Sequence, residues 1–381
     1  MERDQATKLM QDLLRRMVER RGSDLFITAG FPPAIKIDGE VLPVAERPLS
    51  AEQSNLLTRA IMNDRQSREF DATKECQFAI SPQGIGRFRV SAFVQQGSHG
   101  CVIRTIASKI PTVDQLRLPT ILKDVSLLKR GLVIVVGGTG SGKSTTLAAM
   151  LDHRNAETRG HIVTIEDPIE YVHPHRHCVV TQREVGVDTD SWHVALRNTL
   201  RQAPDVIMIG EIRDRETMEF GIQFAETGHL VLATLHANNA NQALDRIINF
   251  FPDEKREQLL MDLSLNIQAL ISQRLIACDG AAGRIAAMEV MLHSPLVADL
   301  IFKGDVAGLK DVMARSNRIG MKTFDQALFD LYEAELISYE DALRNADSKN
   351  ELRLRVKLES KRLEQFGGEE AAALRIADES Q

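Results

Sequence analysis

The stretch VIVVGGTGSGKSTT, residues 133–146, decides the fold of the central part of the chain. The residues from Leu132 to Val136 are apolar and mostly β-branched, which is typical of a short buried strand. The glycines that follow allow a tight turn that directs backbone N–H groups inward, and a helix is expected from Thr145 to Met150. N–H groups gathered at the start of a helix bind anions. The stretch therefore predicts a phosphate-binding loop between a strand and a helix.

The spacing of the glycines, the lysine and the hydroxyls makes this prediction more specific. Residues 137–144 fit the pattern G-x-x-x-x-G-K-[ST] at every fixed position, in the strand and helix context that the pattern requires. Lys143 is expected to reach the β- and γ-phosphates of ATP, and the Ser144 hydroxyl is expected to bind Mg²⁺. The predicted nucleotide-binding residues are Gly137, Gly138, Thr139, Gly140, Ser141, Gly142, Lys143, Ser144 and Thr145.

The composition is that of an ordinary globular protein. The length of 381 residues allows about two or three domains, and 43% of the residues are hydrophobic. The net charge of −6 gives no global basic field, and the aromatic content of 5% provides few surfaces on which bases could stack. We therefore expect no nucleic-acid partner.

The cysteines and the N-terminus indicate a cytoplasmic protein. The four cysteines lie far apart without a C-x-x-C pair, so we expect free thiols in a reducing cytosol. No apolar run approaches the ~18 residues of a membrane span, and the N-terminus lacks the apolar core of a signal peptide. An amphipathic packing helix is predicted there instead, with contact to a membrane surface as the alternative. Its apolar residues are Leu9, Met10, Leu13, Leu14 and Met17.

Changes in the apolar pattern divide the chain into five predicted parts. Residues 1–110 mix helix and strand signals, which predicts an α+β domain, and the prolines of residues 111–120 predict a linker. Residues 121–292 alternate apolar strands with helical segments, which is typical of a parallel α/β sheet. Residues 293–346 are mostly helical, and the charged residues 347–381 predict a flexible, solvated tail. The strands expected in the α/β part are 132–136, 161–165, 206–209, 230–235 and 285–291.

Two acidic clusters directly follow predicted strands. Glu166, Asp167 and Glu170 come after the strand 161–165, and Glu211 comes after the strand 206–209. In open parallel sheets, ligands bind at the carboxyl ends of the strands. Nucleotide hydrolysis requires an acid that positions the metal and a group that orients water. Both clusters are therefore candidates for these roles.

The second cluster departs from the usual arrangement. An aspartate commonly ends the strand at this point, whereas Gly210 stands before Glu211 here. Glu211 is therefore expected to hold Mg²⁺ through a water molecule. The alternative is a structural role, in which these acids cap helices or pair with Arg213 and Arg215.

Two histidines bracket the strand 230–235. His229 precedes it and His236 follows it, and Thr234 carries a hydroxyl near its end. A lone histidine is usually structural. Here a histidine is a candidate for sensing the γ-phosphate or for coupling the site to a neighbouring subunit.

With these blocks in place, the chain resembles the secretion-superfamily hexameric ATPases, and among them the type IV pilus retraction ATPases of the PilT/PilU type. Four blocks carry the resemblance, in the family's order: GGTGSGKSTT, TIEDPIEYVH, PDVIMIGEIRD and TGHLVLATLH. The N-terminal SDLFITAGFPPAIKIDGE resembles the family's PAS-like domain. The resemblance implies an α/β P-loop (RecA-like) ATPase core, with an N-terminal α+β PAS-like domain and a helical C-terminal region.

The resemblance also assigns roles to individual residues. Glu170 matches the glutamate of the family's Asp box, which activates water. Glu211 matches the Walker B glutamate required for hydrolysis, and His229 and His236 match the pair of the His box. The implied activity is hydrolysis of ATP to ADP and phosphate, which drives a motor for pilus retraction and twitching motility.

Members of the family form hexameric rings in which the N-terminal domain of one subunit covers the active site of another. Arginines of that domain act in trans, and Arg104 is the expected residue here. Arg89 and Arg130 are alternatives, for which we favour a role in a salt bridge. The implied partners are the other subunits of a homohexamer, a PilT-type ATPase and an inner-membrane pilus platform protein. The implied location is the inner face of the inner membrane.

The chain also departs from the family's pattern. Gly138 stands where the family usually has proline. Residues 294–306 stand where PilT-type motors carry the signature AIRNLIRE, which retraction requires. Ala298 and Phe302 replace its arginines, and Lys303 replaces its glutamate. A reversed charge at an interface is repulsive. These departures resemble the PilU-type accessory motor.

Two other functions stay open from the sequence. The first is a nucleotide-binding regulatory module with weak turnover that adjusts a partner motor. The second is a nucleic-acid motor on the same core, which the acidic net charge and the few aromatic residues disfavour. Measured ATP turnover separates the first function from a motor, and stimulation of turnover by DNA would indicate the second.

Overall fold

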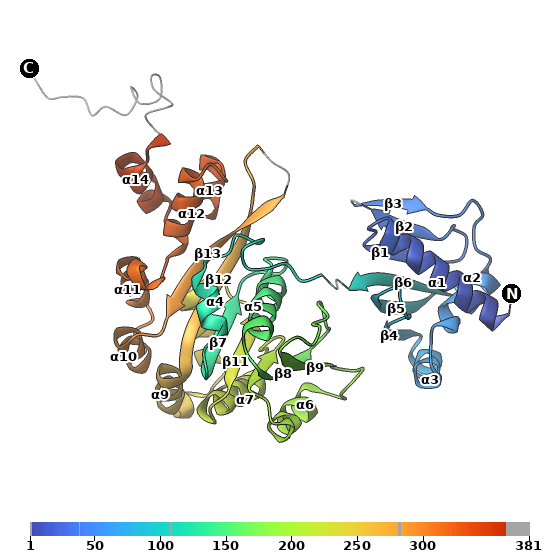
Figure 1. The fold of residues 1–381 in the computed structure, drawn as a ribbon, viewed down its shortest axis with the longest axis horizontal. Helices are drawn as coiled ribbons and strands as arrows, with labels where there is room; N and C mark the ends of the chain where they lie inside the picture. Colours follow the sequence, from blue (N-terminus) through green and yellow to red (C-terminus); the bar gives the residue numbers. More distant parts are fainter. Residues whose placement is uncertain (1, 38, 107–108, 281–282, 363–381) are drawn as a thin grey trace, which may run out of the picture. The chain divides into compact units, whose positions relative to one another are not determined.

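The computed structural model describes residues 2–37, 39–106, 109–280 and 283–362 (Figure 1). Contacts divide the chain into two compact units. The first comprises Met1–Ile110 with the segments Asp167–Pro174 and Gln182–Ser191. The second comprises Pro111–Glu166, His175–Thr181 and Trp192–Gln381. Each unit has its own hydrophobic core.

The first unit contains a six-stranded sheet in the order β3-β2-β1-β6-β5-β4. Every neighbouring pair is antiparallel. The pairs β1–β2, β2–β3, β4–β5 and β5–β6 join strands that are consecutive in the chain, whereas β1–β6 brings the two ends of the unit together. The strands are β1 (Asp24–Ile27), β2 (Ala34–Ile37), β3 (Glu40–Pro43), β4 (Glu75–Ile80), β5 (Arg87–Gln95) and β6 (Ser98–Ile106). The helices are α1 (Arg3–Glu19), α2 (Ala51–Ala60) and α3 (Asp64–Thr73).

Helix α1 is the amphipathic packing helix that the sequence predicts. Met10, Leu13, Leu14 and Met17 are all buried in the core of the first unit. Their spacing of three and four residues places them on one stripe of the helix. Leu9 lies at the border of this stripe and is 39% exposed.

The second unit contains a seven-stranded sheet in the order β13-β12-β7-β11-β10-β8-β9. The strands β12, β7, β11, β10 and β8 are parallel to one another, as the α/β pattern predicts. Strand β13 is antiparallel to β12, so the prediction of a purely parallel sheet is wrong at this edge. The strands are β7 (Gly131–Val136), β8 (Gly160–Glu166), β9 (Cys178–Glu184), β10 (Val206–Ile209), β11 (Leu230–Leu235), β12 (Ile267–Ala277) and β13 (Arg284–Leu292).

Every residue of β7, β10 and β11 is buried, which is typical of central strands covered on both faces. Strands β9 and β12 were not among the strands expected from the sequence. The helices of this part are α4 (Ile121–Ser126), α5 (Lys143–Glu157), α6 (Trp192–Thr199), α7 (Arg215–Glu226), α8 (Ala240–Asn249) and α9 (Arg256–Asn266). Short 3-10 helices cover Leu200–Gln202 and Asp253–Lys255.

Residues 111–120, expected to be a linker, contain no helix or strand. They are nevertheless anchored, because Val113 and Leu118 are buried in the core of the second unit. No helix among the described residues is both long and apolar enough to cross a membrane.

The C-terminal part is helical, as expected. Its helices are α10 (Pro295–Lys303), α11 (Leu309–Arg315), α12 (Phe324–Glu333), α13 (Tyr339–Asn345) and α14 (Lys349–Glu359), with a 3-10 helix at Asn317–Ile319. The expectation of a flexible, solvated tail from residue 347 is wrong for α14. Leu352 and Val356 lie one turn apart on this charged helix and are 1% and 3% exposed, in a core cluster with Phe324 and Phe329. The remainder of the predicted tail, residues 363–381, lies outside the described residues.

The packing of α14 can be tested by truncating Leu352. We expect Leu352→Ala to lose about 2–5 kcal/mol of packing free energy, since a buried leucine leaves a cavity when truncated. Amide hydrogen exchange of the peptide covering Lys349–Glu359 should become faster. Leu354→Ala is the control on the same helix, because Leu354 is 56% exposed and its truncation should change stability by about 0.5 kcal/mol or less. Equal exchange in the two variants would contradict the packing of α14.

Candidate functional site

The glycine-rich loop leaves the carboxyl end of β7 and leads directly into α5. Gly140 and Gly142 adopt φ values of +74° and +90°, a left-handed conformation that favours glycine. Gly142 caps α5 without a side-chain hydrogen bond to the helix. The Lys143 ammonium donates to the carbonyls of Gly137 and Gly138, each at 2.9 Å. The lysine therefore lies over its own loop, where a phosphate chain would bind.

Strand β12 supports this loop through Gln273, which sequence reasoning missed. The Thr146 hydroxyl donates to Gln273 Oε1 at 2.6 Å in the buried interior. A Cβ atom added at Gly137 would lie 2.6 Å from the Gln273 carbonyl oxygen, and one added at Gly142 would lie 2.8 Å from Gln273 Nε2. These two glycines are therefore required by close packing. The signal in the sequence was the buried polar pair Ser272 and Gln273 inside an apolar strand.

Gly138 is in a different situation from its neighbours. No atom lies within 4 Å of a Cβ atom added at this position. The loop therefore has room for a side chain here, and the glycine in place of the family's usual proline removes no packing contact.

The strand register brings the loop, Glu211 and His236 to the same end of the sheet. Val136 lies beside Leu235, so β7 and β11 end together, and β10 ends one strand further along. The His236 Nε2 atom lies 2.9 Å from Glu211 Oε1. The Arg213 Nε–H donates to Glu211 Oε2 at 2.7 Å. Glu211 therefore pairs with Arg213, as the structural alternative predicts, and it also lies at the P-loop end of the sheet.

A pocket of about 680 Å³ opens at this end of the sheet. Gly137 and Gly138 line one side, and His236 and residues of α8 line the other. Arg246 of α8 donates to the His236 carbonyl at 2.9 Å and so fixes the chain where β11 ends.

Close packing explains why a glycine precedes Glu211. The Gly210 N–H donates to the Ile165 carbonyl at 2.8 Å. A Cβ atom at Gly210 would lie 3.1 Å from this oxygen and 3.2 Å from Glu166 Cα. The Thr234 hydroxyl donates to the Gly210 carbonyl. A side chain at this position would press on the backbone of β8, which favours glycine before Glu211.

The structure separates the two histidines. His229 lies at the start of β11, where its carbonyl accepts from the Gly131 N–H at 3.0 Å. His236 lies beyond the other end of the same six-residue strand, roughly 20 Å away at the usual rise per residue. Within one chain, His236 therefore lies at the end of β11 that faces the P-loop, and His229 lies at the opposite end. The role of His229 in coupling to a neighbouring subunit stays a prediction. The His229 ring binds Phe224 and Thr227 locally.

The first acidic cluster is divided between the two units. Glu166 is 7% exposed and accepts from the Thr164 hydroxyl at 2.6 Å, which gives it a structural role at the end of β8. Glu170 is exposed and belongs to the segment Asp167–Pro174 of the first unit. Its assignment as the residue that activates water stays a prediction.

The arginines of the N-terminal sheet are arranged differently from expectation. Arg104 Nε donates to Oδ1 of the buried Asp24 at 2.7 Å. Arg89 lies directly opposite Arg104 on the neighbouring strand and makes no ion pair among the described residues. Its Nε atom is buried without a hydrogen-bond partner, and burial lowers the pKa of its guanidinium. We expect a salt bridge at Arg89 from the sequence, but the structure has one at Arg104 instead. The other alternative, Arg130, is exposed.

Comparison with known proteins gives a consistent result. Residues 2–316 match the family described as Type II/IV secretion system protein. The chain is 60% identical over 350 residues to the type IV pilus ATPase PilU of Pseudomonas aeruginosa, which covers 92% of each chain. It is 44% identical over 335 residues to the type IV pilus retraction ATPase PilT of the same organism, which covers 88% of this chain and 97% of that protein.

A solved structure of the pilus retraction motor PilT with bound ADP is also similar, with a TM-score of 0.85 at 38% identity. The match covers 90% of this chain and 98% of that one. The matches in sequence and in structure thus each cover about nine tenths of the chain. The chain belongs to the Type II/IV secretion system protein family, and it is an ATP-hydrolysing member of that family.

Proposed function

We propose that the chain is a motor that hydrolyses ATP to power type IV pilus retraction, as a PilU-type accessory partner of a PilT-type ATPase. The observation that carries the proposal is the meeting of the P-loop, Glu211 and His236 at one end of the sheet. The similarity to PilU and PilT over about nine tenths of the chain supports the pilus as the place of action.

Binding of the nucleotide follows from the loop and from the start of α5. Backbone N–H groups of the loop and the helix N-terminus receive the phosphates. Lys143, which now contacts the loop carbonyls, exchanges these contacts for the β- and γ-phosphates. The site thus holds the transferring phosphoryl group close to a fixed positive charge.

The residues present fit a magnesium ion held mainly by phosphates and water. Among the described residues, no group of three or more His, Cys, Asp or Glu side chains could hold a metal. Mg²⁺ requires no such cage, since one or two protein oxygens together with substrate phosphates and water are its usual ligands. Ser144 would supply the hydroxyl, and Glu211 the carboxylate through water. When bound, the ion neutralises charge that develops on the phosphates.

Contacts on both of its oxygens hold the Glu211 carboxylate for its proposed role at the magnesium ion. Its carboxylate is 19% exposed and is oriented by His236 on one oxygen and Arg213 on the other. A carboxylate held on both oxygens has little freedom to change its orientation. His236 thereby links the state of the nucleotide to the loop that leads into α8. Glu170 is the residue that we propose to activate the attacking water.

We further propose a homohexameric ring in which an arginine of one subunit completes the site of its neighbour. Two arginines directly opposite each other on β5 and β6 repel, which is unusual for a purely structural pair. Asp24 neutralises Arg104, whereas Arg89 keeps an unpartnered buried N–H group. Arg104 stays the expected trans residue, with Arg89 beside it. The ring is placed in the cytoplasm, against a platform protein at the inner face of the inner membrane.

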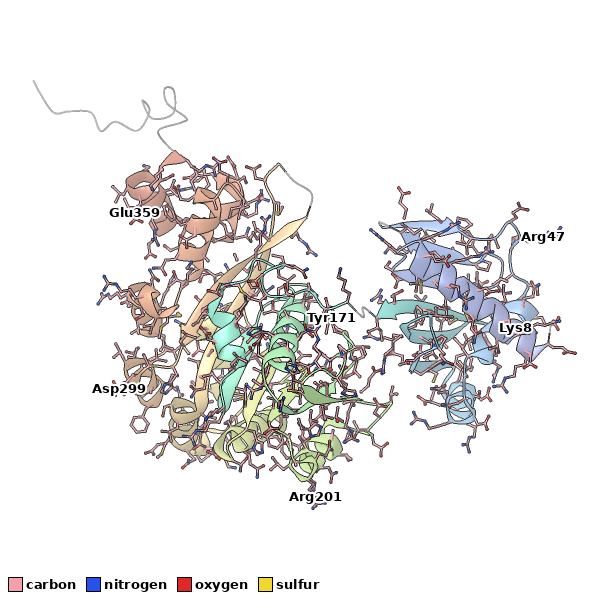
Figure 2. The ribbon with its side chains drawn as sticks, viewed as in Figure 1. Lys8, Arg47, Tyr171, Arg201, Asp299 and Glu359 are labelled. Carbon is pink, nitrogen blue, oxygen red and sulfur yellow. The ribbon has the colours of Figure 1, made fainter. Side chains whose placement is uncertain are left out.

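The surface of α10 supports the accessory role. Val297 and Ile301 are buried, so the helix packs, whereas Phe302 is 51% exposed where PilT-type motors have an arginine. Lys303 pairs with Asp299 at 2.7 Å, and Figure 2 shows Asp299 on this helix. The helix thus presents a surface that differs in charge and polarity from the retraction signature.

Action in trans can be tested with mixed rings. Lys143→Ala and Arg104→Ala should each be inactive alone, because one loses the phosphate-binding cation and the other an arginine worth roughly 10³–10⁵ in rate. In equimolar mixed rings, about a quarter of the sites combine a sound P-loop with a sound neighbour, so about a quarter of wild-type turnover should return. Arg15→Ala, which removes an exposed arginine of α1, is the control and should stay active.

The N-terminal unit of Arg104→Ala must be folded, as judged by circular dichroism, because Asp24 loses its partner. If mixed rings shown to contain both subunits have no turnover, Arg104 does not act in trans. Full activity of a monomer at working concentration would contradict the ring itself.

The accessory role can be tested in living cells. We expect no retraction of labelled pili when the chain is expressed in cells that lack every other retraction ATPase, because α10 lacks the charges of the retraction signature. Adding a catalytically inactive PilT-type motor should restore retraction, since the ATP would then be hydrolysed by this chain. Retraction at normal frequency and speed without the partner would contradict the accessory role.

A further inference from the structure

One arginine of β12 binds two segments that are far apart in the sequence. Arg274 follows Gln273, and successive side chains of a strand point to opposite faces, so Gln273 supports the P-loop while Arg274 faces the other side. The Arg274 Nη2 group donates to the Asn238 carbonyl at 3.2 Å and to Asp347 Oδ1 at 2.7 Å. Its Nη1 group donates to the Asn345 carbonyl. The guanidinium thus joins the loop after β11 to the connection between α13 and α14.

The first of these segments carries His236. Asn238 is two residues beyond His236, and the loop is held at three points around it. Arg246 donates to the His236 carbonyl at 2.9 Å, and the Ala240 N–H donates to Glu289 Oε1 at 2.7 Å. Arg274 provides the third contact, at the Asn238 carbonyl. Since His236 orients Glu211, the position of this loop determines how Glu211 is held.

The second segment is fixed to the C-terminal helices. The backbone N–H of Asp347 donates to Asp325 Oδ1 of α12 at 2.8 Å. The N–H of Ser348 donates to the same carboxylate, and the Ser348 hydroxyl caps α14. The Arg274 guanidinium also lies over the ring of Phe324 in α12, 4.0 Å from its centroid. The contacts of Arg274 therefore extend to α12, α13 and the connection that leads into α14.

The chemistry of this junction requires an arginine. The side chains of Arg274 and Asp347 are 25% and 15% exposed, so water competes only weakly for their charges. A planar guanidinium can bind two carbonyls and a carboxylate while stacking on a ring, and a lysine ammonium cannot reproduce this geometry. These contacts therefore depend on the planar geometry of the guanidinium as well as on its positive charge.

We propose that Arg274 is a positioning residue for ATP hydrolysis, which couples the loop carrying His236 to the helices α12–α14. The inference rests on the proposed function of the P-loop site. Because the nucleotide itself is bound by the P-loop on the other face of β12, loss of Arg274 affects turnover and leaves nucleotide affinity largely unchanged. Because Asp347 holds the same guanidinium, a change on the C-terminal helices reaches the site by this route.

The test compares turnover and nucleotide affinity in the purified full chain. Arg274→Met should lower kcat about tenfold, as expected for the loss of one positioning contact, while the Kd of a fluorescent ATP analogue changes less than about twofold. Asp347→Asn should also lower kcat, although among the described residues Asp347 itself makes no hydrogen bond to the loop that carries His236. The double variant should be no slower than Arg274→Met alone, because two residues that act through one contact are not additive.

Arg355→Met is the matched control. Arg355 stacks on Phe329 at 4.8 Å and pairs with Glu359 at 3.0 Å, with 29% of its side chain exposed, and makes no contact with the loop. Its kcat should equal that of the wild type. Arg274→Lys replaces Arg274→Met if the latter fails to fold, and should show the same loss of kcat.

The outcomes separate this inference from the proposed function. A wild-type chain without ATP turnover would refute the proposed function. Normal wild-type turnover, combined with a kcat of Arg274→Met equal to that of Arg355→Met, would overturn only the role of Arg274. Additive losses in the double variant, or a fall in affinity as large as the fall in kcat, would also overturn it.

Discussion

The common end point of β7 and β11 is the constraint on which the rest of the site depends. Because Val136 and Leu235 are paired in register, the P-loop and His236 leave the sheet side by side. The close approach of Gly210 to β8 then fixes where β10 ends, so that Glu211 reaches His236. The binding of phosphate and the orientation of the candidate acid are thus consequences of one strand alignment. His229, at the other end of β11, is free of this constraint and is left for a different role.

Strand β12 connects this site to the remainder of the second unit. Its Gln273 packs under the glycines of the P-loop, and the adjacent Arg274 contacts the C-terminal helices from the opposite face. One face of the strand thus serves the nucleotide site, and the other face serves the C-terminal helices α12 and α13. A motor requires such a path, because hydrolysis must reach a distant surface. Exposed ion pairs of the helices contribute little free energy, so they couple the site to the helices only weakly. The mostly buried contacts of Gln273 and Arg274 are better suited to this coupling.

The sequence predicted those parts of the fold whose signals are local. The P-loop with its strand and helix, and the strands 206–209 and 230–235, were found at their observed positions. Strand β12 was missed because IQALISQRLIA follows α9 without a turn, and its apolar run does not distinguish a strand from a buried helix. The charged residues of α14 masked the pair Leu352 and Val356, whose burial depends on distant partners. The contacts of Gln273 and Arg274 are likewise non-local: the polar pair Ser272 and Gln273 marks an unusual position in an apolar run, but it does not reveal the partners.

The central claim is that Glu211, held at the P-loop by His236, is required for hydrolysis and not for binding. The most direct measurement compares ATP affinity and turnover in Glu211→Gln with those in Glu219→Gln, an exposed glutamate of α7 that also pairs with an arginine. The account predicts that Glu211→Gln binds ATP with a Kd within about twofold of the wild type, while its kcat falls by at least about 100-fold. Glu219→Gln should match the wild type in both quantities. Turnover of Glu211→Gln close to that of Glu219→Gln would contradict it.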